Sequence, residues 1–275
     1  MRIVGVLLLL VALAGCAGTA EVPAPDGVTF RLEQALSNTD SRKVRVQVVN
    51  DGDAPLTIES LVLTAGRLDG PATFDGHAVV PPGETTKLAV VLPRSRCGKG
   101  LTASLKVEYR RGSHEPVTSV VDPEDVDGSV ADRFDRDCAQ GTLERAATIV
   151  VDPVFEIDGQ GGDSVLHLGV TFEPRSDAVP VTVEGIEPTG LFTFDGDEDG
   201  IVGHTIHADD KPFRIDLPLR PTRCDERVLK DEVTGMLFPL HVRGQEVTGS
   251  FFLPLSNAQR GELRDFVTQH CGLAQ

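Results

Sequence analysis

Apolar and polar residues alternate with a period of two along most of this chain. The alternation is clear in residues 28–32, 43–48, 86–92 and 101–109, which are rich in Val, Thr, Ile and Leu. Strands with this pattern bury one face and expose the other, as in antiparallel sheets. Turn-forming runs such as Asn-Asp-Gly at 50–52 separate these segments. About six to eight short strands in about 120 residues predict an immunoglobulin-like sandwich.

The sequence also repeats itself with an offset of about 125 residues. The run Thr-Phe-Asp-Gly occurs at 73–76 and again at 193–196, and Val-rich segments precede it in both halves. Each copy is long enough to bury a core of its own. We therefore predict a mainly β (all-β) chain with two tandem immunoglobulin-like β-sandwich domains, at residues 28–145 and 146–275.

Helical periodicity is present only late in each unit. Residues 256–267 begin with Ser256, a good N-cap, and place Leu263, Phe266 and Val267 on one face. Residues 127–137 are a shorter counterpart in the first unit. The pattern predicts a short C-terminal helix in each domain.

The cysteines follow the repeat. Apart from Cys16, each unit has one cysteine in its middle and one near its end, and none of the four forms a C-x-x-C pair. An even number in an exported chain favours disulfides over metal thiolates. Four cysteines allow three connectivities, and the repeat favours pairing within a unit, which would stabilise each domain by about 4 kcal/mol. The predicted disulfides are Cys97–Cys138 and Cys224–Cys271.

The N-terminus has the three-part layout of a secretory signal, with Arg2, an apolar run over residues 3–13 and small residues before Cys16. The run from Leu13 to Cys16 matches the processing site of a bacterial lipoprotein, in which the cysteine thiol takes a lipid such as palmitate. We predict a signal peptide at residues 1–15, lipidation of Cys16 and a flexible tether at residues 16–27. This places the protein on the extracytoplasmic face of the cell membrane, lipid-anchored.

This segment has two other interpretations. An ordinary cleaved signal peptide is compatible with residues 12–14, which have the small-x-small form. A membrane-spanning helix needs about 20 apolar residues, and the run here is too short. Lipidation of Cys16 explains the cysteine directly after the small residues.

Charge and aromatic content limit the partners. The chain has 42 acidic and 26 basic residues and a formal net charge of −16. Such a surface repels nucleic acids, so we expect no nucleic-acid partner. The chain has no Trp and one Tyr, and carbohydrate modules usually stack sugars on such rings. We therefore expect no carbohydrate ligand.

One acidic loop has the start of a calcium-binding pattern. Asp195, Asp197 and Asp199 alternate with other residues and precede Gly200, as in the D-x-D-x-D-G run of calcium loops. The twelfth position is Ile206, where a bidentate Glu is expected, and no helices flank the loop. We predict no obligatory cofactor; these three aspartates are the candidate metal ligands, for Ca²⁺, and His204, His207, Asp209 and Asp210 just beyond them are a weaker candidate site for zinc or copper(II). The alternative is a solvated acidic hairpin.

Signals of hydrolase chemistry are weak. Ser164 follows Gly162 and Asp163, as in the nucleophile block of GDS-type esterases, but the D-x-x-H block that should follow near the C-terminus is missing. Asp265 and His270 are spaced too far apart for it, and no G-x-S-x-G motif occurs. We therefore predict no catalytic residue and no enzyme activity.

The sequence resembles two groups of bacterial proteins. Residues 46–58 resemble the N-x-G-x-x-P-L-x-I run of bacterial immunoglobulin-like modules. Over its mature length the chain is similar to a family of uncharacterised actinobacterial secreted proteins and lipoproteins, through residues 223–226, residues 234–240 and the helix that ends before Cys271 and Gly272. The resemblance implies paired β-domains on the cell envelope and carries no activity.

These observations together predict a cell-envelope lipoprotein that is a non-enzymatic binding or scaffolding protein. Its expected partners are the membrane, through the N-terminal lipid, and another protein of the envelope. The first alternative is a calcium- or divalent-metal-dependent adhesion or metal-handling module that uses Asp195, Asp197 and Asp199. The second alternative is a cryptic hydrolase that uses Ser164.

Overall fold

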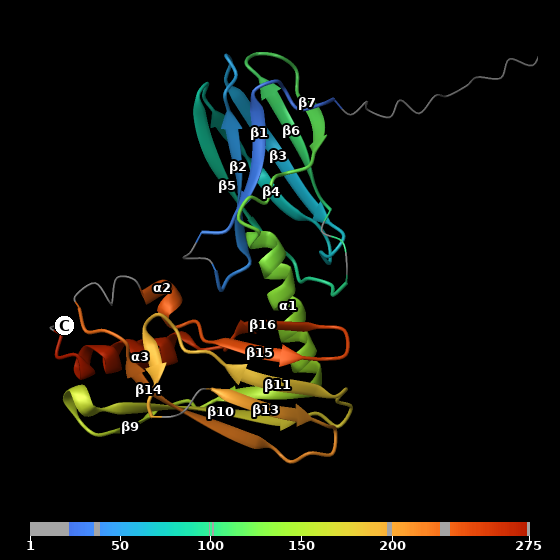
Figure 1. Ribbon diagram of the computed structural model, residues 1–275. Helices are drawn as coiled ribbons and strands as arrows, with labels where there is room; N and C mark the ends of the chain where they lie inside the picture. Colours follow the sequence, from blue (N-terminus) through green and yellow to red (C-terminus); the bar gives the residue numbers. More distant parts are fainter. Residues whose placement is uncertain are drawn as a thin grey trace, which may run out of the picture.

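The computed structural model describes residues 22–35, 39–98, 100, 102–196, 200–225 and 232–273. In this part of the chain one end of the first β-sandwich faces the second, whose strands run across those of the first, and one long helix crosses the junction (Figure 1). The arrangement confirms the predicted fold class: a mainly β chain with two tandem immunoglobulin-like domains, each with a helix after its strands and one disulfide.

The first domain packs two antiparallel sheets face to face. Its strands are β1 (Val28–Glu33), β2 (Lys43–Asn50), β3 (Leu56–Ala65), β4 (Ala72–Val80), β5 (Glu84–Val91), β6 (Ala103–Arg111) and β7 (Val117–Val121). The strand orders are β1-β2-β5 and β4-β3-β6-β7. Alternation in β2 buries Val44, Val46 and Val48, each of which contributes about 1.5–3 kcal/mol. Asn50 is also buried, and its amide donates to the carbonyls of Ala54 and Val80, which fixes the turn after β2.

The second domain has the same two-layer design. Its strands are β8 (Ala147–Val151), β9 (Glu156–Asp158), β10 (Val165–Pro174), β11 (Val181–Ile186), β12 (Phe192–Phe194), β13 (Ile201–Ile206), β14 (Phe213–Pro221), β15 (Pro239–Arg243) and β16 (Thr248–Phe252). One sheet has the order β12-β14-β10-β8, with β9 on β10, and the other has the order β13-β11-β15-β16. A 3₁₀ turn (η2, Gly161–Asp163) and a single helical turn (α2, Glu232–Gly235) lie in its connections.

Helix α3 (Asn257–His270) closes the second domain where the sequence predicts a helix. Ser256 is its N-cap and forms a reciprocal capping box with Gln259. Leu263, Phe266 and Val267 are buried in the core of the second domain. The capping residue and the apolar face of the prediction are therefore both confirmed.

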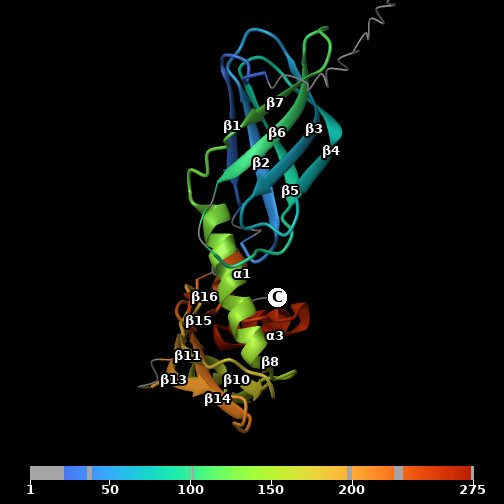
Figure 2. The same ribbon diagram turned by 90° about the vertical axis from the view of Figure 1, so that its right-hand side faces the viewer.

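Helix α1 (Ser129–Ala146) belongs to both domains, as Figures 1 and 2 show. Its first half places Val130 and Phe134 in the core of the first domain. Its second half places Leu143 and Ala146 in the core of the second domain, directly before β8. The sequence predicts a helix only over residues 127–137, and the structure extends it because the second half finds an apolar partner on the other domain.

Small residues let α1 approach the second domain closely. A Cβ added to Gly249 in β16 would lie 3.5 Å from the Cβ of Ala139. A Cβ added to Gly244, in the turn before β16, would lie 2.8 Å from a side-chain carbon of Thr142. The glycine at 244 is therefore needed for the contact between helix and sheet.

Each domain has the predicted disulfide. Cys97, in the segment after β5, pairs with Cys138 of α1. Cys224, in the segment after β14, pairs with Cys271 at the end of α3. Both bonds therefore attach a loop of the sandwich to the helix that follows it.

The signal peptide, Cys16 and the predicted tether up to residue 21 lie outside the described residues. Residues 22–24 of the predicted tether are held by the first domain: the N–H of Val22 donates to the carbonyl of Thr118, the carbonyl of Pro23 accepts from the hydroxyl of Ser119, and Ala24 packs against the core. No helix in the described part of the chain is long and apolar enough to span a bilayer. Lipidation of Cys16 stays a prediction.

On the sheet surface of the second domain, His167 lies between two carboxylates. Its Nδ1 is 2.6 Å from a carboxylate oxygen of Asp216 and its Nε2 is 3.3 Å from one of Asp158. The hydrogen bond to Asp216 is the main cause of a raised pKa for His167. The protonated ring therefore joins β9, β10 and β14.

We expect Phe134→Ala to weaken both domains, although Phe134 lies in the core of the first. Loss of a fully buried ring costs about 3–5 kcal/mol, and freeing the first half of α1 should loosen its second half on β16. Hydrogen exchange followed by mass spectrometry should show faster exchange of amides in β16. Leu56→Ala is the control, because Leu56 is buried in the same core at the end of β3 that lies away from α1 (Figure 1). Unchanged exchange in β16 in the Phe134 variant would contradict the coupling.

We expect part of the stability of this protein to depend on pH through His167. Because its pKa is raised on folding from an ordinary value of 6.5, its contribution is complete below about pH 6.5 and is lost as pH rises through the folded pKa. Thermal unfolding between pH 6 and pH 8.5 should show a larger loss of Tm in the wild type than in His167→Gln. Equal slopes in the two proteins would show that the ring contributes nothing.

Candidate functional site

A groove lies where the two domains meet along α1. Two cavities of about 450 and 680 Å³ form it, and they share Arg94, Gly141, Glu144, Arg145 and Pro254. We call this surface the interdomain groove. Its volume is in the range of small-molecule sites, which are mostly clefts of about 300–1,000 Å³.

Three structural units contribute the walls of the groove. The first domain supplies Arg42, Arg94 and Ser95, and α1 supplies residues between 133 and 145. The second domain supplies residues around β8, the turn after β10 and the end of β16. The lining residues are Asp40, Arg42, Arg94, Ser95, Cys97, Arg133, Arg136, Asp137, Gln140, Gly141, Glu144, Arg145, Ala147, Thr148, Ile149, Arg175, Asp177, Val179, Phe251, Phe252 and Pro254.

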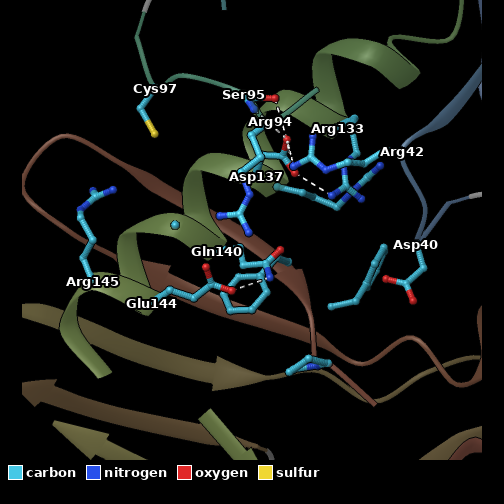
Figure 3. A pocket seen from close by; sticks show the side chains of 15 residues that line it. Asp40, Arg42, Arg94, Ser95, Cys97, Arg133, Asp137, Gln140, Glu144 and Arg145 are labelled. Atoms are coloured by element: carbon cyan, nitrogen blue, oxygen red, sulfur yellow. Dashed lines mark hydrogen bonds and ion pairs between the residues drawn. The ribbon is translucent and has the colours of Figure 1, made fainter. Parts of the chain in front are cut away.

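A buried carboxylate organises the upper end of the groove. The side chain of Asp137 is 4% exposed and accepts hydrogen bonds from Arg42 (2.7 Å) and Arg133 (2.6 Å). The hydroxyl of Ser95 donates to the same carboxylate at 2.6 Å (Figure 3). These partners compensate the burial of a charge that would otherwise be costly. Together with the neighbouring Cys97–Cys138 disulfide, they hold the segment that carries Arg94 against α1.

Arg136 adds a partly buried cation next to this network. It donates to the side chain of Gln34 at 3.1 Å, and its guanidinium lies 5.4 Å from the ring centroid of Phe252. Desolvation, followed by repulsion from Arg133, lowers the pKa of Arg136. A guanidinium stays protonated at neutral pH even so, so Arg136 contributes positive potential to the groove.

Three arginines of the groove have no acidic partner. Among the described residues, no carboxylate lies within 4.0 Å of the guanidinium of Arg94, Arg145 or Arg175. Glu144, their acidic neighbour in the groove, accepts a hydrogen bond from Gln140 at 2.7 Å instead (Figure 3). Many other arginines of this acidic chain do form ion pairs, for example with Glu124, Asp152 and Glu184.

The net charge of the groove is therefore positive, whereas the net charge of the whole chain is negative. Six arginines and four acidic residues line its two cavities, whereas the chain has a formal net charge of −16. Two of the four carboxylates are already used in ion pairs, Asp137 with Arg42 and Arg133, and Asp40 with Arg260. The other two, Glu144 and Asp177, form no ion pair among the described residues, so the groove keeps a surplus of two positive charges, and Arg94, Arg145 and Arg175 keep donors for an anion.

Gly141 keeps the floor of the groove open. It lies in the middle of α1, where glycine costs the helix about 1 kcal/mol relative to alanine. A Cβ at this position would have only the Arg145 guanidinium near it, at 3.8 Å. Packing therefore does not require a glycine here, and the position has no side chain that would take up space in the groove.

Of the three predicted metal ligands only Asp195 is described, and it does not line the groove. Asp195 forms an ion pair with Arg220, with 2.6 Å between Oδ1 and Nε. Asp197 and Asp199 lie outside the described residues. Among the described residues, no group of three or more His, Cys, Asp or Glu side chains could hold a metal ion. Calcium binding by Asp195, Asp197 and Asp199 stays a prediction.

The fold brings Ser164 and His270 together, although the chain lacks the D-x-x-H block that would have predicted such a pair. The Oγ of Ser164 lies 3.0 Å from Nδ1 of His270. The same hydroxyl donates to the carbonyl of Gly161 at 2.7 Å, and Nδ1 also lies 3.1 Å from the carbonyl of Ser164. Because the hydroxyl of Ser164 donates its proton to the carbonyl of Gly161, Nδ1 of His270 is the donor in its contact with Ser164 and does not act as a base. Ser164 is also 4% exposed, so the pair fastens the η2 turn to α3.

Sequence reasoning missed the groove because its cations come from distant segments. Arg94 is in the run before Cys97, Arg145 is at the end of α1 and Arg175 follows β10. The available signal was the position of Arg94 in the repeated Leu-Pro-to-Cys segment. Nothing local indicates that α1 brings this segment to the second domain.

Comparisons with protein-family models and with curated protein sequences find no match. Among solved structures, the chain is similar to red sea bream transglutaminase, with 14% identity over 85% of this chain and 32% of that chain and a TM-score of 0.27. It is also similar to CBD12 from CALX1.2, with 15% identity, coverage of 80% and 78% and a TM-score of 0.22. A third similar structure is the E. coli chaperone DraB, with 12% identity, coverage of 82% and 98% and a TM-score of 0.21. The fold assignment rests on the strand pairing and the two cores of this chain itself.

Proposed function

We propose that this protein is a non-enzymatic binding protein of the cell envelope, held at the extracytoplasmic face of the membrane by lipid on Cys16. The interdomain groove is its ligand site. The observation that carries the proposal is the set of three arginines, Arg94, Arg145 and Arg175, that line one groove without a carboxylate partner.

The frame of the groove supports a binding role. Both cores enclose part of α1, and the Arg260–Asp40 ion pair is a second connection between the domains. The walls therefore keep their spacing without a ligand. A preformed site avoids the ordering cost that reduces affinity in flexible ones.

The charge of the groove supports the same role. The arginines that share the groove repel one another. In so acidic a protein, a short shift of one arginine side chain toward a carboxylate would reduce this repulsion. Arrangements that lower stability in this way are typical of functional sites. An anionic ligand would remove the repulsion.

Among its described lining residues the groove has no histidine and no free thiol. Its two hydroxyls belong to Ser95 and Thr148, and that of Ser95 donates to Asp137, whose carboxylate also accepts from Arg42 and Arg133. Ser164 and His270 lie elsewhere, in the contact between η2 and α3. This supports binding without catalysis.

The lipid anchor leads to a localisation test. We expect Cys16→Ala to move the protein from the membrane fraction to the soluble extracytoplasmic fraction. Cell fractionation with immunoblotting measures the change, and metabolic labelling with a palmitate analogue should label the wild type alone. Cys97→Ala together with Cys138→Ala is the control, because these cysteines form a disulfide and should leave labelling unchanged. Membrane association of the Cys16 variant would contradict the anchor.

The groove leads to a binding test with the natural ligand pool. We expect a small-molecule extract of the cell envelope to raise the Tm of the full chain, and we expect Arg94→Gln together with Arg145→Gln to abolish the shift. Arg45→Gln is the matched control, since Arg45 also has no acidic partner within 4.0 Å among the described residues but lies in β2, outside the groove. A shift that survives in the double variant would place binding outside the groove.

A further inference from the structure

We infer that the ligand of the interdomain groove is a small molecule with a phosphate monoester group, bound by Arg94, Arg145 and Arg175. This inference rests on the proposed function, because it names the ligand class of the same groove.

The first step concerns the number of free donors. A guanidinium has five N–H donors in a planar fork that matches phosphate and carboxylate oxygens. For the side chain of Arg145 the only hydrogen bond is a long one, 3.4 Å to the hydroxyl of Thr142. Arg94 and Arg175 have no side-chain hydrogen bond among the described residues. Almost all of their donors are therefore available.

The second step concerns the charge that these donors require. A carboxylate has one negative charge and two oxygens, whereas a phosphate monoester has a charge of about −1.5 to −2 and three acceptor oxygens at neutral pH. Six arginines against four carboxylates leave the groove a surplus of two positive charges, which matches the second group better. The buried Nε atoms of Arg133 and Arg136, which have no hydrogen-bond partner, add further positive potential at the same cavity.

The third step concerns the size of the ligand. The net charge of −16 repels large anions such as nucleic acids, anionic bilayers and acidic proteins. Salt screens that repulsion beyond about 8 Å, so an anion inside the groove interacts mainly with the arginines that line it. A small ligand therefore benefits from the groove, whereas a large one must approach the acidic surface around it.

The fourth step concerns the rest of the ligand. A phosphate group fills only a small part of cavities of about 450 and 680 Å³. Ala147, Ile149, Val179 and Pro254 line the larger cavity beside the arginines. These apolar side chains favour a ligand whose phosphate is attached to a partly apolar body.

Isothermal titration calorimetry of the full chain at constant ionic strength tests this inference. The probes are phenyl phosphate, inorganic phosphate and benzoate, which separate the phosphate group from the apolar ring. We expect phenyl phosphate to bind at one site and benzoate to bind at least about tenfold more weakly, because hydrogen bonds to charged groups contribute about 1.5–3 kcal/mol. Inorganic phosphate should bind with intermediate affinity.

Variants assign the binding to the groove. Arg94→Gln should weaken phenyl phosphate about tenfold or more, Arg94→Lys should weaken it less, and Arg45→Gln should have no effect. Arg94 is in a surface segment, and an unchanged Tm of Arg94→Gln would show that it folds. If Arg94→Gln does not fold, Arg175→Gln takes its place. Phosphate binding that none of these variants weakens would overturn the inference.

The remaining outcomes are also decisive. Benzoate binding as tightly as phenyl phosphate would identify a carboxylate site and overturn the inference. Binding to phosphatidic acid vesicles but not to phenyl phosphate would identify a lipid headgroup as the ligand. If no phosphate probe binds while the envelope extract still shifts the Tm through Arg94 and Arg145, the ligand class is wrong and the proposed function stands. If the extract shift is also independent of these arginines, the proposed function fails.

Discussion

The arrangement of this molecule depends on one helix that is buried in two cores at once. Phe134 is enclosed by the first sandwich and Leu143 by the second, and the rise of an α-helix places these two residues about 13 Å apart along its axis. The distance between the cores is therefore set by a rigid rod. A flexible linker would let the groove open and close, whereas a shared helix keeps Arg94 of one domain beside the second domain.

Electrostatics inside the groove follows from this frame. Asp137 is placed by α1 and accepts from Arg42, Arg133 and Ser95, so its negative charge is fully used within the first domain. Arg94, Arg145 and Arg175 form no ion pair with Asp137. A fixed helix thus separates the arginines into two groups: those paired with Asp137 and those, Arg94, Arg145 and Arg175, that have no carboxylate within 4.0 Å among the described residues.

The sequence predicts what is local in this structure and misses what is not. Alternation predicts strands such as β2, because the buried Val44, Val46 and Val48 are neighbours in one strand. The repeat predicts both disulfides, because each joins residues within one unit. Residues 138–146 are too polar to predict a helix by themselves, since their apolar partner is β16, about 100 residues later in the chain. The groove also depends on the contact between α1 and β16, so no local sequence pattern predicts it.

The acidic surface and the cationic groove make opposite demands on the surroundings of the protein. Under the proposed anchoring at Cys16, an anionic membrane surface would repel the domains, and residues 16–21 could extend by about 20 Å between the lipid and the first domain. At that distance salt would screen most of the potential of the bilayer. The arginines of the groove would then be exposed to dissolved anions rather than to lipid headgroups. Separation from the membrane and selection for small ligands would thus have one physical cause, the surplus of carboxylates outside the groove.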